Sequence, residues 1–197
     1  MKSIILASQS PRRRELLRLI GLEFEAMPSG CEENTKAIDP GEVVMDLSGI
    51  KCMDIAGKIM NGELTPKAAS PEGYLVVGSD TIVVFEGQII GKPKDREDAF
   101  RTLKRLSGNT HSVYTGVTVF DTATGKREVF YERTLVTFFE LTDEEISAYV
   151  SSGDPMDKAG SYGVQGPGAF LVKRIEGDYF TVVGLPIARL YHTLKKF

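Results

Sequence analysis

The sequence predicts an α/β protein built on a mixed β-sheet with flanking helices, and two observations support this. Segments with the apolar spacing of helices alternate with β-branched, apolar runs along the whole chain. In the second half, two long apolar runs, 110–121 and 127–141, follow each other around Thr124-Gly125, which indicates paired strands rather than a strict strand–helix–strand series. No internal repeat or linker-like stretch interrupts the chain, so we expect one domain over residues 1–197.

Apolar patterning and helix-capping residues predict the elements of the first half. Ser10 and Pro11 are typical residues to begin a helix, and Gly21 is typical of its end. The run 74–85 is so hydrophobic that we expect a strand near the centre of the sheet. The expected order is strand 2–8, helix 11–21, strand 22–30, loop 31–42, a long helix ending at Asn61-Gly62, an exposed loop 63–73 and strand 74–85.

The second half is expected to combine a hairpin, three helices and several strands. Asp95 and Thr142 are suitable N-caps for two of the helices, and Gly108 is a suitable stop for the first of them. The expected order is a hairpin turn at 86–88 into a strand 89–91, helix 96–108, strands 110–121 and 127–141, helix 143–153, a glycine-rich loop 160–168, strand 168–177, a short strand near 179–183 and a final helix from Pro186.

Composition excludes several classes of function. The 197 residues carry a formal net charge of −3, whereas bulk binding to nucleic acid or to an anionic membrane requires a basic surface. The two cysteines, Cys31 and Cys52, form no CxxC pattern, so we expect free thiols and a cytoplasmic location. The first residues do not read as a signal peptide, and no apolar run is long enough to span a membrane. We interpret His111 and His192 as structural, because they show no metal-ligand spacing.

Three consecutive arginines stand where a helix N-terminus already carries partial positive charge. Apolar spacing places Arg12 and Arg13 on the inward side of the helix, and Arg14 is expected to face water. One interpretation is a solvated basic turn. The other is an anion site, in which backbone N–H groups, arginine side chains and the hydroxyls of Ser8 and Ser10 bind a phosphate.

Two further charges lie inside apolar patterns. Lys51 interrupts the apolar stripe of the long helix, so it either extends to the surface or projects into a pocket that needs a cation. Asp80 lies within a β-branched strand, where an unpaired carboxylate is costly. It is either a structural group bonded to local N–H groups, or a metal ligand or general base. Glu33, beside Glu32 in the polar loop, could supply a second carboxylate for Mg²⁺.

Two loops add candidate ligand-binding residues. Lys92 lies in a Gly/Pro turn just before a helix, although the turn lacks the pattern of a Walker A motif. The glycine-rich stretch 157–170 contains Lys158 and Gln165, and composition alone does not distinguish a flexible loop from a ligand loop. The amide of Gln165 could both donate to and accept from the edge of a base.

Taken together, these stretches resemble the Maf family of nucleoside triphosphate pyrophosphatases. Five matching stretches occur in the family's order and span nearly the whole chain, which makes the resemblance specific. They are LASQSPRRRELL (6–17), GSDTIV (78–83), GKPKDREDAFRTLKRLSGNTHSVYTGV (91–117), DKAGSYGVQGPGAFLV (157–172) and GDYFTVVGLP (177–186).

The resemblance implies a fold and an activity. The implied fold is a long, twisted mixed sheet flanked by helices, with two lobes around a central cleft, similar to inosine triphosphate pyrophosphatases. The implied reaction is hydrolysis of dTTP and UTP to a nucleoside monophosphate and pyrophosphate, with Mg²⁺ or Mn²⁺ as cofactor. A cytoplasmic homodimer is implied, as are links to nucleotide-pool cleaning and to arrest of septum formation. The alternatives are a nucleotide-sensing regulator of septum formation with little catalysis, and a different phosphohydrolase.

The resemblance also assigns roles to individual residues. Asp80 matches the catalytic acceptor. Our hypothesis is that one or both of Glu33 and Asp80 also hold the divalent metal. Matches to specificity positions are Arg12, Thr81 and Gln165, and matches to positions around the triphosphate and metal are Ser8, Arg13, Glu33, Lys51 and Lys92. The chain departs from the family pattern where Asp46 replaces an arginine of the RLAxxKA helix motif and Gly49 enters that helix, and where Thr181 replaces an asparagine.

Overall fold

The computed structural model describes residues 2–197 and divides the chain into two compact units. The first contains the chain up to Asp80 together with 115–132 and 184–197, and the second contains 81–114 and 133–183. Strands β3 (Tyr74–Phe85), β5 (Thr110–Asp121) and β6 (Arg127–Phe138) contribute residues to both units. That the chain is one domain stays a prediction.

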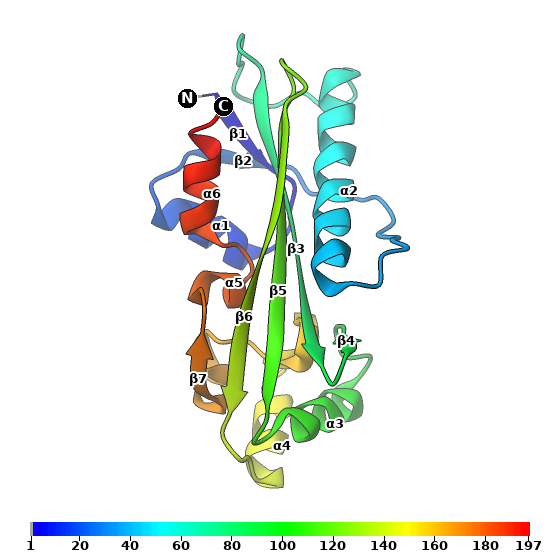
Figure 1. The fold of residues 1–197 in the computed structure, drawn as a ribbon, viewed down its shortest axis with the longest axis vertical. Coiled ribbons are helices and arrows are strands. Elements are labelled where there is room, and N and C mark those ends of the chain that lie inside the picture. The colour runs from blue at the N-terminus through cyan, green and yellow to red at the C-terminus, as the bar shows by residue number, and fades with distance from the viewer. Residues whose placement is uncertain (1) are drawn as a thin grey trace. The chain divides into compact units, whose positions relative to one another are not determined.

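A mixed sheet organises the chain, as predicted (Figure 1). Its strand order is β2-β1-β3-β5-β6-β7, and β4 pairs with β3 off this path. Strand β1 (Ser3–Leu6) is parallel to both β2 (Phe24–Ala26) and β3, whereas β4 (Gln88–Ile90) and β7 (Val172–Glu176) pair antiparallel with their neighbours. The interior position predicted for the hydrophobic strand β3 is confirmed.

Local capping explains the first helix. Helix α1 (Pro11–Leu19) has Pro11 in its first turn, and the side chain of Ser10 accepts a hydrogen bond from the backbone N–H of Arg13. Gly21 follows the helix with a φ of 71°, a left-handed conformation that favours glycine. Leu16 and Leu17 are the buried residues of α1, which confirms the predicted apolar face.

Helix α2 (Pro40–Met60) lies on one side of the first unit's strands, and α1 and α6 (Ile187–Leu194) lie on the other (Figure 1). Asp39 caps α2 by accepting from the N–H groups of Gly41 and Glu42. The side of α2 that meets the sheet joins one buried cluster with β1 and β3. Its fully or almost fully buried members are Ile5, Ala7, Cys52, Ile55, Ala56, Val76 and Phe120.

Two glycines in the strands let α2 lie directly on the sheet. A Cβ atom at Gly78 on β3 would collide with the carbonyl oxygen of Ser48, and one at Gly116 on β5 would collide with the carbonyl of Val44. The hydroxyls of Ser48 and Thr118 are also 2.9 Å apart in the same buried layer. The backbone of α2 is therefore closer to these strands than side chains at the two glycine positions would allow.

The second unit packs α3 (Arg96–Leu106) and α4 (Asp143–Ser151) around its own core. Asp95 caps α3, and Thr142 forms a capping box with Glu145 at the start of α4, so both predicted N-caps are confirmed. Buried residues of this core include Val83, Leu103, Leu106, Val113, Val136, Phe138, Ile146 and Leu171.

Four sequence predictions in the last third were wrong. The expected loop 160–168 includes parts of two 3-10 segments, Ala159–Ser161 and Gly166–Leu171, so β7 begins at Val172 rather than 168. Strand β6 ends at Phe138 rather than 141. The expected strand near 179–183 is helix α5 (Tyr179–Val183).

The side chain of Asp178 explains why the β-branched residues of α5 are helical. Its carboxylate accepts from the backbone N–H of Phe180 and from both the N–H and the hydroxyl of Thr181. These bonds satisfy N–H groups that a helix N-terminus leaves without partners. Thr181, which departs from the family pattern, thus keeps a turn contact of its own.

The buried histidine and cysteine fit a structural interpretation. The ring of His111 lies edge-on to Phe138 and Tyr162 and shares a 2.8 Å hydrogen bond with the Tyr162 hydroxyl, and burial lowers its pKa to about 4. Burial raises the pKa of the Cys52 thiol to about 12. His192 is exposed on α6. No helix in the described part of the chain is long and apolar enough to cross a membrane.

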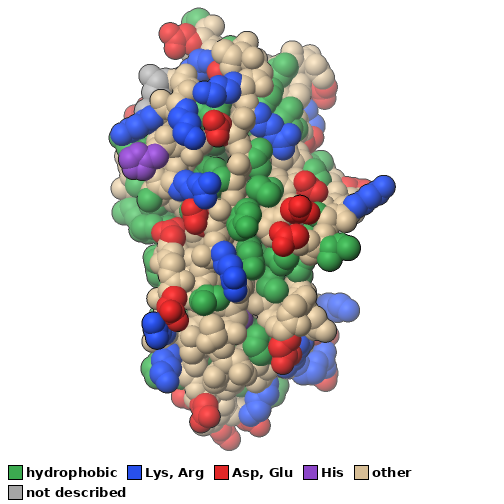
Figure 2. All heavy atoms as spheres, in the orientation of Figure 1, with side chains coloured by type: hydrophobic (Ala, Val, Ile, Leu, Met, Phe, Trp, Pro, Cys, Tyr) green, Lys and Arg blue, Asp and Glu red, His purple; other side chains and the backbone are tan. Residues whose placement is uncertain are grey.

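Charged side chains of both signs occur across the face shown in Figure 2, between apolar and uncharged patches. Several of them form ion pairs, such as Lys104 with Asp143 at 2.6 Å and Arg189 with Glu132 at 2.7 Å. Exposed pairs of this kind contribute little to stability, typically about 0–1 kcal/mol. The stability of the fold therefore depends mainly on buried apolar side chains, such as those of the clusters described above, and on the close approach of α2 to the sheet.

We expect Gly78→Ala to lower the free energy of unfolding by at least about 1–3 kcal/mol, because the new methyl group meets helix backbone that has no space to move. Gly57→Ala, within α2 and with open space around its Cβ position, is the matched control, expected to be neutral or stabilising. Urea denaturation of both variants measures the difference. Equal stability of the two variants would contradict the proposed close packing.

Candidate active site

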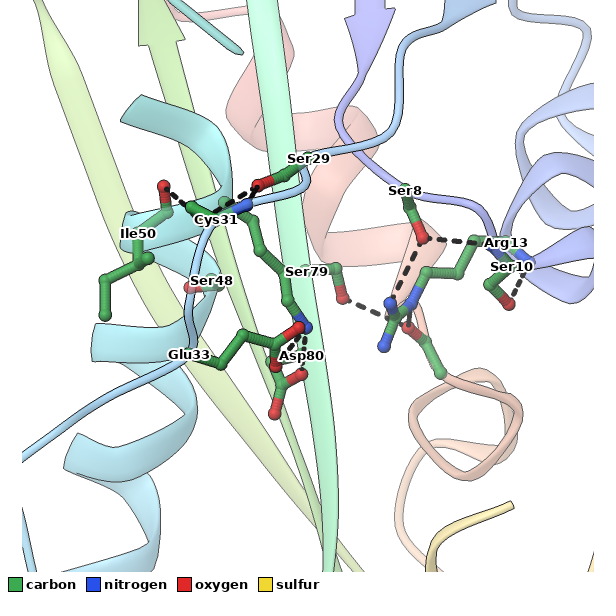
Figure 3. Close-up of polar contacts among 12 residues, drawn as sticks. Ser8, Ser10, Arg13, Ser29, Cys31, Glu33, Ser48, Ile50, Ser79 and Asp80 are labelled. Carbon is green, nitrogen blue, oxygen red and sulfur yellow. Dashed lines mark hydrogen bonds and ion pairs between the residues drawn. The ribbon is translucent and has the colours of Figure 1, made fainter. Parts of the chain in front are cut away.

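The start of α1 is joined to the buried segment before α6 by Arg13 (Figure 3). Its Nε donates to the carbonyl oxygen of Gly184 at 2.8 Å, and its Nη1 is 3.3 Å from the hydroxyl oxygen of Ser8. The Ser8 oxygen also accepts from the backbone N–H of Ser10. The hydroxyl of Ser79 on β3 donates to the same Gly184 carbonyl at 3.1 Å. The prediction that Arg13 points inward is confirmed.

The negative charges of two acids in the same unit act on the pKa of Arg13. Burial lowers the pKa of its guanidinium, while the negative charges of Asp80 and Glu33 act in the opposite direction. Arginine nonetheless remains charged in proteins. The interior around Ser8 and Gly184 therefore holds a permanent cation whose electrostatic partners are the two candidate acids.

Arg14 differs from its prediction. It is half-buried rather than water-facing, and its Nε atom is buried without a hydrogen-bond partner. The four-residue spacing puts Arg14 on the same face as the exposed Arg18, but spacing does not determine how deeply each stem lies. Arg12, between the capping turn and Arg13, is also half-buried.

The ammonium of Lys51 lies between two carboxylates. Its Nζ atom is 2.5 Å from Oδ1 of Asp80 and 2.9 Å from Oε2 of Glu33. The side chains of Lys51 and Asp80 are 13% and 12% exposed, so their pair is largely shielded from water, whereas Glu33 is 48% exposed. Lys51 is therefore not a cation extended to the surface, and its projection into a ligand pocket stays a prediction.

The strand geometry of β3 divides its polar side chains between two faces. Successive residues of a strand point to opposite sides of the sheet. Ser79 accordingly points to Gly184 and Arg13, and Asp80 points to α2 and Lys51 (Figure 3). Both are buried, with Ser79 0% and Asp80 8% exposed. One short piece of β3 thus supplies a polar group to each side of the sheet.

The predicted site residues fall into two sets. The first unit contains six of them: Ser8, Arg12, Arg13, Glu33, Lys51 and Asp80. A hydrogen bond links Arg13 to Ser8, and ion pairs link Lys51 to Glu33 and Asp80. The charges of both acids also act on the pKa of Arg13. Thr81, Lys92 and Gln165 belong to the second unit.

In the second unit, the turn that carries Lys92 is joined to the glycine-rich segment that leads to Gln165. The N–H of Gly160 donates to the carbonyl of Gly91 at 3.1 Å, and a Cβ at Gly160 would meet Val83 of β3 at 2.7 Å. Lys92 is exposed and Gln165 is half-buried. The segments that bear these two residues are therefore neighbours within that unit.

Ser79 and Gly184 are site residues that the sequence did not reveal. A serine in a buried strand often has only a packing role. Gly184 contributes its backbone carbonyl, a group that every residue has. The available signal was indirect, because Ser79 adjoins Asp80 and Gly184 lies in the stretch VVGLP at 182–186.

The departures in α2 also find structural explanations. Asp46 accepts a 2.6 Å hydrogen bond from the hydroxyl of Thr35. Gly49 faces Arg127 of β6, because a Cβ at this position would be 2.5 Å from Nη2 of that arginine. Asp46 therefore contacts the loop before α2, and Gly49 makes room for a side chain from the sheet.

The cluster has the chemistry of a partial divalent-cation site. Mg²⁺ prefers carboxylate oxygens, keeps several waters and is commonly bound through one or two carboxylates together with substrate phosphates. Glu33 and Asp80 supply two such carboxylates on either side of Lys51. Among residues 2–197 no group of three or more His, Cys, Asp or Glu is placed to hold a metal by itself. The residues present fit a cation that shares its ligands with a phosphorylated substrate.

The fold and the sequence relate this chain to known proteins. The structure of a HAM1 protein from Coxiella burnetii is similar over the full length of both chains, with a TM-score of 0.54 at 14% identity, which concerns the fold alone. The Maf-like protein family matches residues 3–197, and the chain belongs to this family.

Curated relatives cover the whole chain. A protein of Agathobacter rectalis named dTTP/UTP pyrophosphatase is 54% identical over 200 residues, which are 100% of this chain and 98% of the relative. A protein of Bacillus thuringiensis with the same name is 50% identical over 198 residues, covering 100% and 96%. The family that the sequence motifs indicated is thus confirmed.

We expect Arg13→Lys to lower the free energy of unfolding by about 1–3 kcal/mol, because one ammonium cannot replace the two donors that reach Gly184 and Ser8. Arg18→Lys, on the exposed side of the same helix, is the control and should change stability by less than about 0.5 kcal/mol. Chemical denaturation measures both. If the two variants were equally stable, the contacts of Arg13 would have no structural role.

Proposed function

We propose that this chain hydrolyses dTTP and UTP between the α and β phosphates, which yields a nucleoside monophosphate and pyrophosphate. The observation that carries the proposal is the buried Asp80 carboxylate, paired with Lys51 beside Glu33. This cluster lies in a Maf-family chain that is about 50% identical, over its whole length, to curated dTTP/UTP pyrophosphatases.

Asp80 acts as the general base in this proposal. Water attacks the α-phosphorus and gives a proton to the Asp80 carboxylate, while the bond to the bridging oxygen breaks and pyrophosphate leaves with the electron pair. Its buried strand and the 2.5 Å contact with Lys51 hold the carboxylate in one orientation. Such positioning and electrostatic stabilisation provide most of the catalysis in reactions of this type.

Cationic side chains of the first unit stabilise the charge that develops on the leaving pyrophosphate. Lys51 lies at the carboxylates, and Arg12 and Arg13 lie at the start of α1. Because Nε of Arg13 is bonded to Gly184, we assign Arg13 a supporting role, in which it contributes charge and holds Ser8 in place. The Ser8 oxygen accepts two bonds, so its own hydrogen is the group we assign to a phosphate.

A divalent cation, Mg²⁺ or Mn²⁺, fits this cluster as the cofactor. When bound, it supplies charge neutralisation at the phosphates. Glu33 and Asp80 are the residues we assign to hold it, since they are the two carboxylates that face each other across Lys51. The structure offers these two protein ligands, and substrate oxygens and water complete the set in our proposal.

The remaining assignments follow from family resemblance. We infer that Arg12, Thr81 and Gln165 select the pyrimidine nucleotide, with the Gln165 amide donating to and accepting from the base edge. Lys92 contacts the triphosphate in the same proposal. We also infer a cytoplasmic homodimer that binds a nucleotide and neither stable nucleic acid nor membrane. A regulatory effect on septum formation would use the same pocket.

The test is a substrate screen with product analysis. Purified protein with Mg²⁺ or Mn²⁺ is given each common nucleoside triphosphate, and monophosphate, pyrophosphate and orthophosphate are resolved. We expect pyrophosphate, released from dTTP and UTP above the others. Asp80→Asn should lower kcat by about 10²–10⁴-fold with the fold intact, as expected for loss of a general base.

Orthophosphate as the first product would indicate a different phosphohydrolase. Nucleotide binding without turnover of any triphosphate would favour the sensor. An Asp80→Asn variant with the wild-type rate would remove Asp80 from the catalytic role.

We expect Lys51→Met to bind Mn²⁺ more tightly than the wild type in the absence of nucleotide, because the two carboxylates lose their internal cation. Electron paramagnetic resonance titration of free Mn²⁺ measures this without turnover. Lys67→Met, which removes the same charge from an exposed position, is the control. Weaker Mn²⁺ binding by Lys51→Met would mean that Lys51 is needed to assemble the site.

A further inference from the structure

The segment that carries Glu33 lies along α2 and is attached to it by alternate side chains. Residues 29, 31, 33 and 35 face the helix, and their polar atoms reach Asp54, the carbonyl of Ile50, Lys51 and Asp46 respectively. The residues between them, 30, 32 and 34, are exposed, as is Glu33 itself. Contacts from every second residue are typical of an extended chain, and their partners lie within residues 46–54 of α2.

One attachment lies on the N-terminal side of Glu33. The hydroxyl of Ser29 donates to Oδ2 of Asp54 at 2.8 Å and accepts from the N–H of Cys31 at 3.3 Å. Burial acts to raise the pKa of Asp54, but bonds from Lys58 and Ser29 outweigh it and leave that pKa lowered. The ionised carboxylate of Asp54 is thus a strong acceptor for this end of the segment.

The other attachment lies on the C-terminal side. The hydroxyl of Thr35 donates to Oδ2 of Asp46 at 2.6 Å and accepts from the N–H of Ala37 at 3.0 Å. A carboxylate is a strong acceptor for a hydroxyl, so this bond holds the C-terminal side of the segment on α2.

Glu33 lies two residues from Thr35 and four from Ser29, between these attachments. Its side chain is 48% exposed, so packing alone does not select one rotamer. Ordering such a residue costs both backbone and side-chain conformational entropy. The attachments on both sides reduce the backbone cost before any ligand arrives, and the ion pair with Lys51 holds the carboxylate across from Asp80.

We propose that Thr35 and Asp46 are positioning residues for Glu33. Their hydrogen bond holds one end of the segment on α2, and the bond between Ser29 and Asp54 holds the other end. The Glu33 carboxylate is thereby placed to share a divalent cation with Asp80. The inference rests on the proposed function, because it assigns the cluster to cation binding. Neither Thr35 nor Asp46 contacts the substrate in this proposal.

The test is a double-mutant cycle read by Mn²⁺ binding without nucleotide, followed by electron paramagnetic resonance. Thr35→Val keeps the size of the side chain and removes the hydroxyl, and we expect it to weaken Mn²⁺ binding by roughly 3- to 10-fold, the effect of one hydrogen bond. Thr35→Ser should restore wild-type affinity. In the Glu33→Gln background, Thr35→Val should cause no further loss, since the group it positions is gone.

A second measurement separates positioning from general destabilisation. Thr35→Val and Asp46→Ala should both speed hydrogen exchange of the N–H groups in 30–38, with the unfolding midpoint unchanged. Under turnover the same variants should need more metal for half-maximal rate and keep kcat at saturating metal. Glu42→Ala is the matched control for Asp46→Ala, because it makes the same change at an exposed position of α2.

The outcomes distinguish the inference from the proposed function. If Glu33→Gln weakens Mn²⁺ binding but Thr35→Val and Asp46→Ala do not, the positioning role is overturned and the cation role of Glu33 stands. Equal losses from Thr35→Val with and without Glu33 would also overturn it. If Glu33→Gln binds Mn²⁺ as the wild type does, both the cation role of Glu33 and the positioning role are wrong.

Discussion

The contact between Lys51 and Asp80 is the interaction on which the rest of the site depends. A carboxylate that is 8% exposed on an interior strand is unfavourable without a partner, and the ammonium of Lys51 at 2.5 Å supplies one. Lys51 also pairs with Glu33 at 2.9 Å, so a neutral residue at Asp80 leaves the ammonium with a carboxylate partner. The pair with Asp80 joins α2 to β3, and the pair with Glu33 places that carboxylate across from Asp80.

Two kinds of support hold the two carboxylates. Asp80 belongs to β3, a strand buried on both faces, so its backbone moves only with the sheet. Glu33 belongs to an irregular segment whose attachments to α2 are side-chain hydrogen bonds. Proteins open locally most readily where few apolar contacts are buried. Asp80 is therefore as rigid as the core of the sheet. Glu33 is only as rigid as a surface segment that is attached to α2 on either side of it.

Sequence reasoning predicted the fold class from apolar patterning, and it singled out two charges of the candidate site because they were out of place. Asp80 and Lys51 interrupt apolar patterns, and such interruptions are visible without a structure. The contributions of Ser79 and Gly184 were not predictable, since one is a small polar residue and the other acts through a carbonyl. Helix α5 was predicted as a strand because its β-branched residues favour strands. The hydrogen bonds by which Asp178 caps this helix are not visible in the apolar pattern.

The close approach of α2 to the sheet has a mechanical consequence. Gly78 and Gly116 lie against the carbonyls of Ser48 and Val44, which are one helical turn apart, so the helix is interlocked with two strands at two levels. It cannot slide along its axis or roll without first lifting off the strands. A displacement of Lys51 is therefore opposed by β3 and β5 together. The part of α2 that carries this charge is rigid relative to both strands.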